Sequence, residues 1–327
     1  MERKLISLCV PVLNEAENIQ PFYDRVSAVI GGLSDRYDFE FLFTDNHSSD
    51  RTFEILTELA QRDRRVRAIR FSRNFGFQRS ILTNYRHARG LAAIQLDCDL
   101  QDPPEMIVEF LRHWEQGYQV VYGVRRKRPN EAMWLQLSRR AFYRLIDFLS
   151  EERLPHDAGD FRLIGDKILE YLRRYNDPQP YLRGTVSTLG FRQIGIPYDR
   201  SPRTQGKSKF NLFSLIALAV DGLCNHSTVP LRFASVLGIG FFLLAVLGTV
   251  YYAIGRFSFA ANWPVGLASS SILTLFSIGM NALFLGIIGE YVGRIFKAVK
   301  MAPVTVIENV VDADLAADSP KPEGNHS

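Results

Sequence analysis

The sequence has few cysteines and only a small net charge, and each of these features excludes a class of protein. The three cysteines, Cys9, Cys98 and Cys224, stand far apart and match no zinc-binding spacing. A sparse, odd cysteine count is typical of a reducing compartment. The net charge of +4 over 327 residues is too small to indicate a nucleic-acid-binding protein. The first residues do not resemble a signal peptide, because their apolar run is short and leads directly into acidic residues.

Charged residues are absent from two long runs in the C-terminal third, 233–255 and 257–289. A membrane-spanning helix needs roughly 20 apolar residues, so each run is long enough to hold one. The basic residues that flank the two runs are Arg232, Arg294, Lys297 and Lys300. By the positive-inside rule, we expect both chain ends in the cytoplasm and the hairpin tip outside. A pair of buried core helices is the alternative, which Gly and Phe on every helical face disfavour.

Short β-rich runs alternate with helical patterns in the first part of the chain. The expected strands are 5–10, 39–44, 66–71, 91–96 and 118–123. The expected helices between them are 15–30, 50–63, 78–89 and 104–116. This alternation predicts an α/β fold with a mostly parallel sheet and helices on both faces. In such sheets ligands bind beyond the carboxyl ends of the strands, so the site is expected there.

Three carboxylates crowd the segment LDCDLQDPP, residues 96–104, at the end of an expected strand. If the strand continues, Asp97, Asp99 and Gln101 point to the same side, because side chains alternate along a strand. These oxygen donors predict a site for Mg²⁺ or Mn²⁺, with a solvated turn as the alternative. Asp102 precedes two prolines and a helix, so we expect it to cap that helix.

Several motifs stand out along the chain, and the first four lie at or beyond the ends of expected strands. They are VPVLNEAENI at 10–19, TDNHSSDRT at 44–52, SRNFGFQ at 72–78, DCDLQDPPEMI at 97–107, DAGDFRL at 157–163 and SPRTQGKSKF at 201–210. As a set they resemble the family 2 inverting glycosyltransferases with a GT-A fold. Together with the two charge-free runs, they make the chain similar to the polyisoprenyl-phosphate glycosyltransferases. That group includes dolichol-phosphate mannose synthases and bacterial undecaprenyl-phosphate glucosyltransferases of the GtrB type.

The resemblance implies a reaction and its location. The expected donor is a UDP-sugar, the acceptor is polyprenyl (undecaprenyl) phosphate, and the cofactor is Mg²⁺ or Mn²⁺. Glucose is the expected sugar, with N-acetylglucosamine, mannose and a modified arabinose left open. The expected place is the bacterial inner (plasma) membrane, with the catalytic domain in the cytoplasm. No nucleic-acid partner is expected, and homo-oligomerisation is left open.

The resemblance also implies roles for particular residues. Those expected to bind the nucleotide sugar are Pro11, Leu13, Glu15, Asp45 and Asp97. The expected metal ligands are Asp97, Asp99 and Gln101. The residues expected at the acceptor phosphate are Arg125, Arg203, Ser208 and Lys209, with plain attraction to anionic lipid as the alternative. Asp160 resembles the proposed general base, although it could instead position an arginine or a turn. His47 and Asn46 depart from the family pattern beside Asp45.

The implied organisation has four parts. Residues 1–200 form the catalytic domain, 201–230 an acceptor loop with an interfacial amphipathic helix, 231–300 two transmembrane helices, and 301–327 a disordered acidic tail. The helical segments 134–149 and 210–223 could lie in the bilayer interface, with a core-facing helix as the alternative for each. Two other function classes stay open, a non-catalytic nucleotide-sugar scaffold and a transporter subunit. The acid pair disfavours the first, and the lack of charge within the spans disfavours the second.

Overall fold

The described residues of the computed structural model are 3–126, 158–177, 180–200, 267–300 and 303–312, with scattered helical positions between 234 and 254. The chain divides into two compact units. The first contains residues 1–136, 154–209 and 301–327, and the second contains 137–153 and 210–300. The first unit therefore extends past the predicted boundary at residue 200 and also includes the C-terminal segment.

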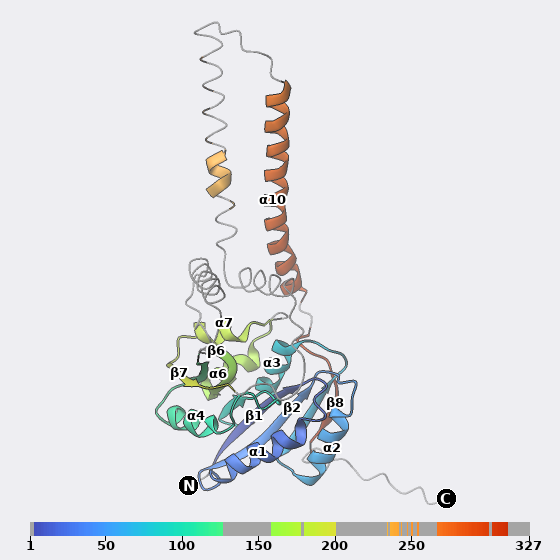
Figure 1. The fold of residues 1–327 in the computed structure, drawn as a ribbon, viewed down its shortest axis with the longest axis vertical. Coiled ribbons are helices and arrows are strands. Elements are labelled where there is room, and N and C mark those ends of the chain that lie inside the picture. Colours follow the sequence, from blue (N-terminus) through green and yellow to red (C-terminus); the bar gives the residue numbers. More distant parts are fainter. Residues whose placement is uncertain are drawn as a thin grey trace, which may run out of the picture. The chain divides into compact units, whose positions relative to one another are not determined.

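The described strands of the first unit form one sheet (Figure 1). Their order in the sheet is β7-β5-β6-β4-β1-β2-β3-β8. The strands are β1 Lys4–Val12, β2 Tyr37–Asp45, β3 Val66–Phe71, β4 Ala92–Gln95, β5 Val120–Arg125, β6 Ala158–Gly165, β7 Gln193–Tyr198 and β8 Ile307–Val311. The helices of this unit are α1 Ile19–Gly31, α2 Thr52–Arg62, α3 Phe77–His87, α4 Met106–Glu115, α6 Asp166–Arg174 and α7 Leu182–Thr188. Every strand and helix predicted before residue 126 is present, with its ends shifted by a few residues.

The sheet is mixed but mostly parallel, which confirms the predicted α/β class. Strand β1 pairs in parallel with β2 and β4, β2 pairs in parallel with β3, and β5 pairs in parallel with β7. The antiparallel members are β6, between β4 and β5, and β8, beside β3. The chain runs outward from β1 to β3 and then returns to place β4 on the other side of β1. This reversal opens a crevice at the carboxyl ends of β1 and β4.

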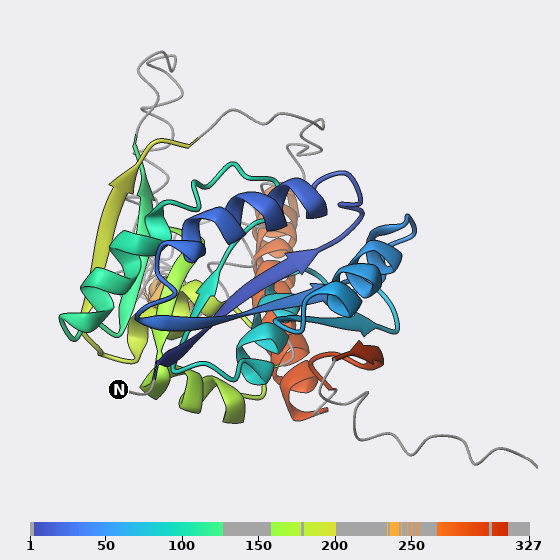
Figure 2. The same ribbon diagram turned by 90° about the horizontal axis from the view of Figure 1, so that it is seen from below.

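Successive residues of these buried strands face opposite sides of the sheet, and helices cover both sides (Figure 2). On one face, Leu8 and Val10 of β1 join the core formed with α1, α2 and α4. On the other face, Cys9 packs with α3, α6 and α7. Fully burying one large apolar side chain contributes about 1.5 to 3 kcal/mol, so these two layers hold the strand ends in fixed positions.

Strand β8 corrects the prediction of a disordered tail for residues 307–311. It pairs antiparallel with β3 at the edge of the sheet. Just after it, the side chain of Asp312 is only 1% exposed and lies 2.9 Å from Arg67 and 2.8 Å from Arg89. The acidic composition of the segment suggested disorder, but this carboxylate meets two arginines of the sheet unit. The disorder expected over 313–327 concerns residues outside the described part.

The second unit contains helix α10 (Leu267–Val299), which covers most of the second charge-free run. Within the part of the chain that the structure describes, no helix meets the combined demand of length and apolarity for crossing a membrane. The first charge-free run lies mostly outside the described residues. So do the segments 134–149 and 210–223 and the predicted acceptor residues Arg203, Ser208 and Lys209.

Candidate active site

A cavity of about 340 Å³ lies at the carboxyl ends of β1, β2 and β4, where the sheet reverses its order. Its wall combines the ends of these strands with the loop before α3. The lining residues are Pro11, Val12, Leu13, Glu15, Asn46, Asn74, Gly76, Phe77, Ser80, Asp97, Cys98 and Asp99. Three residues predicted to bind a nucleotide sugar, Pro11, Leu13 and Glu15, therefore lie on one wall. This volume is in the range of small-ligand sites.

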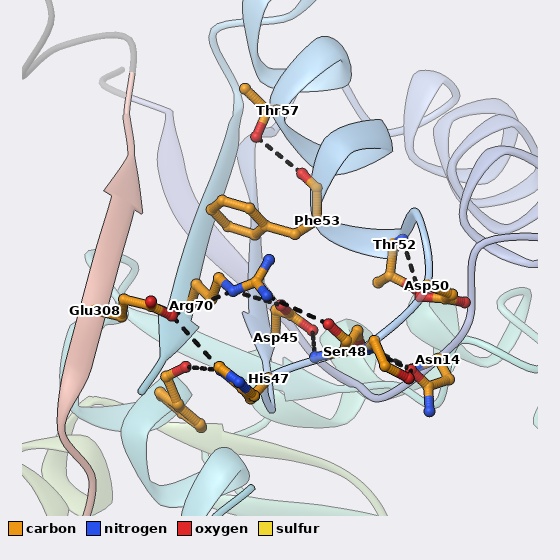
Figure 3. A network of polar contacts seen from close by, with 12 residues as sticks. Asn14, Asp45, His47, Ser48, Asp50, Thr52, Phe53, Thr57, Arg70 and Glu308 are labelled. Atoms are coloured by element: carbon orange, nitrogen blue, oxygen red, sulfur yellow. Dashed lines mark hydrogen bonds and ion pairs between the residues drawn. The ribbon is translucent and has the colours of Figure 1, made fainter. Parts of the chain in front are cut away.

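The loop after β1 is held in place by the loop after β2 (Figure 3). Asn14 adopts a left-handed backbone conformation with φ 55°, a conformation that Asn tolerates better than most residues. Its N–H donates to Ser48 Oγ at 2.9 Å, and its Oδ1 accepts from the Ser49 N–H at 2.8 Å. The Glu15 N–H donates to Thr52 Oγ1 at 2.9 Å. The cavity wall is thus fixed by hydrogen bonds between two strand ends.

Asp45 lies beneath this wall instead of on it. Its side chain is completely buried at the end of β2, and its Oδ1 accepts from the Ser48 N–H at 3.0 Å. The neighbouring Asn46 lines the cavity, and its Oδ1 accepts from the Phe75 N–H at 2.8 Å. The contact of Asp45 with a nucleotide base stays a prediction.

The acids that follow β4 do not continue the strand. Strand β4 ends at Gln95, and Leu100 adopts a left-handed φ of 54°, so side-chain alternation does not bring the oxygen donors together as predicted. Asp97 and Asp99 nevertheless both line the cavity. Gln101 is buried outside the lining, and its N–H donates to Asp99 Oδ1 at 3.2 Å. The two carboxylates reach the cavity because the chain turns after β4, and not because side chains alternate along a strand.

The predicted capping role of Asp102 is wrong. Helix α4 begins at Met106, and the residue at its cap position is Glu105. Asp102 instead accepts a hydrogen bond from the Tyr198 hydroxyl at 2.5 Å and lies 3.3 Å from Arg200. It therefore connects the acidic loop to the end of β7.

Negative charge accumulates around Asp97. Burial raises its pKa to about 7, with further contributions from the charges of Asp102, Asp99 and Asp160 that outweigh a hydrogen bond from Gln95. A cation at this wall would relieve the repulsion. Among the described residues, no group of three or more His, Cys, Asp or Glu side chains is arranged to hold a metal on its own. Two carboxylates beside an open cavity still fit Mg²⁺ or Mn²⁺, because such ions complete their shell with water and substrate phosphates.

Asp160 on β6 is held by two arginines. Arg183 of α7 donates from Nε to Oδ1 at 3.0 Å and from a terminal nitrogen to Oδ2 at 2.7 Å, and Arg162 lies 3.7 Å from Oδ1. Burial alone would raise the pKa of Asp160, but the hydrogen bond and charge of Arg183, helped by Arg162, outweigh it and lower the pKa. A carboxylate stabilised in its ionised form is a weak base, so this geometry favours positioning over proton abstraction.

Arg125 is the one predicted acceptor residue within the described chain. It ends β5, and its Nε donates to the Tyr198 hydroxyl at 3.3 Å. Burial would lower its pKa, but the hydrogen bond to Tyr198 and the charges of Asp102 and Asp97 raise it. Tyr198 thus links the predicted acceptor residue to the acidic loop.

Sequence reasoning missed Arg183, Gln78 and Tyr198. Gln78 lies within the motif SRNFGFQ, and its Nε2 donates to Asp160 Oδ2 at 3.3 Å. No local pattern signals Arg183 or Tyr198, because their partners are distant in the sequence. The fold brings Gln78 and Arg183 to Asp160, and Tyr198 to Asp102 and Arg125.

Comparison with known proteins identifies the family. The model described as glycosyl transferase family 2 matches residues 7–173, which contain most of β1, the strands β2 to β6 and the whole cavity wall. The chain belongs to glycosyl transferase family 2. This glycosyltransferase is 38% identical over 304 residues to the uncharacterized glycosyltransferase YkcC of Bacillus subtilis, covering 92% of this chain and 93% of that protein.

Two further relatives extend the comparison. The family 2 glycosyltransferase is 32% identical over 304 residues to the bactoprenol glucosyl transferase of Shigella phage SfV, covering 93% of this chain and 98% of that protein. Among solved structures, it is similar to the mannosyltransferase PcManGT of Pyrobaculum calidifontis in complex with GDP-Man and Mn²⁺. That likeness has a TM-score of 0.43 and 16% identity, and covers 92% of this chain and 88% of that one.

Proposed function

We propose that this glycosyltransferase transfers glucose, with inversion, from UDP-glucose to a polyprenyl phosphate at the cytoplasmic face of the bacterial inner membrane. The observation that carries the proposal is the likeness, over nearly the whole of both chains, to a protein named bactoprenol glucosyl transferase. The site agrees with it, because a strand-end cavity with two carboxylates on its wall suits a nucleoside diphosphate sugar.

The proposed reaction is a single displacement. An oxygen of the acceptor phosphate forms a bond to the anomeric carbon of glucose while the bond from that carbon to UDP breaks. A phosphate monoester has a second pKa of about 6, so the attacking oxygen is already ionised near neutral pH. Asp160 then need not remove a proton. Its ion pair with Arg183 would instead orient the arginine toward the reacting groups.

Asp97 and Asp99 would hold Mg²⁺ or Mn²⁺. The backbone N–H of Gln101 would orient Asp99 through its hydrogen bond to Oδ1. The bound cation would neutralise charge that develops on the leaving diphosphate. Asp99→Asn should leave the fold intact, because the residue lies in a loop at the cavity, yet lower turnover by about two orders of magnitude or more. Excess EDTA should have the same effect on the unaltered protein.

The enzyme must bind the lipid acceptor at the membrane surface. Each CH₂ of the lipid that is buried in the bilayer contributes about 0.8 kcal/mol to the free energy that keeps the lipid there. The charge-free runs 233–255 and 257–289 support a membrane hairpin, and the basic residues beside them support a cytoplasmic catalytic unit. Arg125, Arg203, Ser208 and Lys209 would then bind the lipid phosphate.

The decisive experiment is mass spectrometry of the lipid product. The purified full-length protein, undecaprenyl phosphate and Mn²⁺ are incubated with UDP-glucose, UDP-N-acetylglucosamine and GDP-mannose in separate reactions. A product with the mass of a hexosyl lipid from UDP-glucose, absent with Asp99→Asn, supports the proposal. A product from another donor corrects the sugar, whereas no product from any donor contradicts the proposed acceptor or donor class.

Topology is tested by cysteine labelling in intact cells. Asn262→Cys lies in the proposed outer turn, and Leu315→Cys lies in the proposed cytoplasmic tail. A membrane-impermeant maleimide should label the first variant and leave the second unlabelled until the cells are opened. Labelling of Leu315→Cys alone from outside would reverse the proposed orientation.

A further inference from the structure

Strand β8 brings a carboxylate from the end of the chain to the polar groups that follow β2 and β3 (Figure 3). In its register with β3, Asn309 lies opposite Arg70, and the pairing shifts between Arg70 and Phe71. Glu308 Oε2 consequently lies 3.3 Å from Arg70 Nε and 3.5 Å from His47 Nδ1. Glu308 lies in the segment that was predicted from the sequence to be a disordered tail.

The carboxylate of Asp45 has one oxygen without a hydrogen bond. Oδ1 accepts from the Ser48 N–H, whereas no described residue donates a hydrogen bond to the buried Oδ2. The nearest cation, Arg70 Nε, is 3.8 Å from Oδ2, which is too long for a hydrogen bond. A buried acceptor without a hydrogen bond raises the free energy of the folded protein. A hydrogen bond from a donor that reaches Oδ2 would therefore be favourable.

Arg70 lies between the two carboxylates. Its Nε is closer to Glu308 than to Asp45, and a terminal nitrogen donates to the Ser48 carbonyl at 3.3 Å. The guanidinium also lies over the ring of Phe53, 5.0 Å from its centroid. Glu308 and Asp45 are therefore both within ion-pair distance of the same nitrogen, Arg70 Nε, and in this structure Glu308 is the nearer of the two.

The position of Glu308 is set by a buried ion network at the end of β8. Asp312 pairs with Arg67 and Arg89, and Arg67 also donates to Glu40 at 2.8 Å. The side chains of Asp312, Arg67 and Glu40 are all less than 10% exposed. Glu308 itself is 49% exposed, so its location depends on the anchored strand and not on its own burial.

We propose that Glu308 is a positioning residue for recognition of the donor's nucleotide base. By holding Arg70, it keeps the guanidinium from closing on Asp45 and leaves Oδ2 able to accept an N–H of the base. This inference rests on the proposed function, in which a nucleoside diphosphate sugar occupies the cavity. Loss of Glu308 should let Arg70 pair with Asp45 and so compete with the base.

The test compares a ligand that has a base with one that lacks it. Binding of UDP and of inorganic pyrophosphate, each with Mn²⁺, is measured by calorimetry on the full-length protein. Glu308→Gln should weaken UDP binding about threefold to fivefold, the size expected for a half-exposed ion pair, while pyrophosphate binding stays unchanged. Glu58→Gln is the matched control. Glu58 is also an exposed carboxylate paired with an arginine, Arg62, but this pair lies on α2 and not on β8.

The same substitution made in an Arg70→Met variant shows whether Glu308 acts by holding Arg70 or only by stabilising β8. In Arg70→Met, adding Glu308→Gln should have no further effect on UDP binding, because no guanidinium remains to be held. Equal loss of UDP and pyrophosphate binding, unchanged UDP binding, or a loss that persists in full in Arg70→Met would each overturn the inference. Failure of the unaltered protein to bind either UDP or GDP would instead contradict the proposed function.

Discussion

The crowding of carboxylates around Asp97 predicts that the metal-free protein loses stability as the pH rises. Burial and the neighbouring acids raise the pKa of Asp97 from 3.8 to about 7 in the folded protein. Between these two values the folded protein holds a proton on Asp97 that the unfolded chain has released. Stability from this residue is therefore fully present below about pH 4 and is lost progressively as the pH rises through 7.

The size of the effect follows from the shift. One pKa unit corresponds to 1.36 kcal/mol, so about 2 to 3 kcal/mol of stability should be lost between pH 5 and pH 8. The measurement is chemical denaturation in EDTA at both pH values, for the unaltered protein and for Asp97→Asn. The asparagine has no proton to release, so the variant should lack this part of the pH dependence.

Other groups also titrate between pH 5 and pH 8, so the informative quantity is the difference in pH dependence between the two proteins. Mn²⁺ should reduce the loss for the unaltered protein, because a cation favours the ionised carboxylate. Equal pH dependence for the unaltered protein and Asp97→Asn would refute the assignment of the raised pKa to Asp97.

Two further variants test other parts of the fold. Asp312→Asn should lower the free energy of unfolding by about 2 to 3 kcal/mol, because it removes one partner from the buried pair with Arg67, and urea denaturation measures the change. The variant Arg183→Lys should reduce kcat roughly tenfold with little change in the KM for the donor, because lysine lacks the two-pronged contact with Asp160. A changed KM with an unaltered kcat would place Arg183 in donor binding instead.

The sheet up to β5 was predictable because its strands and helices carry strong local patterns. Runs such as FEFLFT are rich in β-formers, and the loops that follow them are polar. Strand β6 is harder to recognise, since its sequence AGDFRLIG places two charged residues, Asp160 and Arg162, in a buried strand. The charge of Asp160 is tolerated because Arg162 and Arg183 offset it, and the charge of Arg162 is offset by Asp160. No local sequence pattern reveals such pairing.

The site was predictable to the extent that it lies at strand ends. Pro11, Leu13, Glu15, Asp97 and Asp99 all line one cavity because the sheet order brings β1 and β4 together. The contacts that orient the site come instead from later elements. Arg183, Tyr198 and Glu308 meet residues far away in the sequence, and their identities follow only from the folded topology.

The pairing of β8 with β3 changes how the chain can be divided. The second unit, 137–153 and 210–300, is inserted within the sequence of the catalytic unit, because the sheet is completed only after residue 303. A truncation that ends near residue 209 would leave the edge of β3 without its partner strand and Arg67 without Asp312. An uncovered strand edge promotes aggregation. A shortened catalytic domain should therefore keep residues 303–312, joined to residue 209 by a linker.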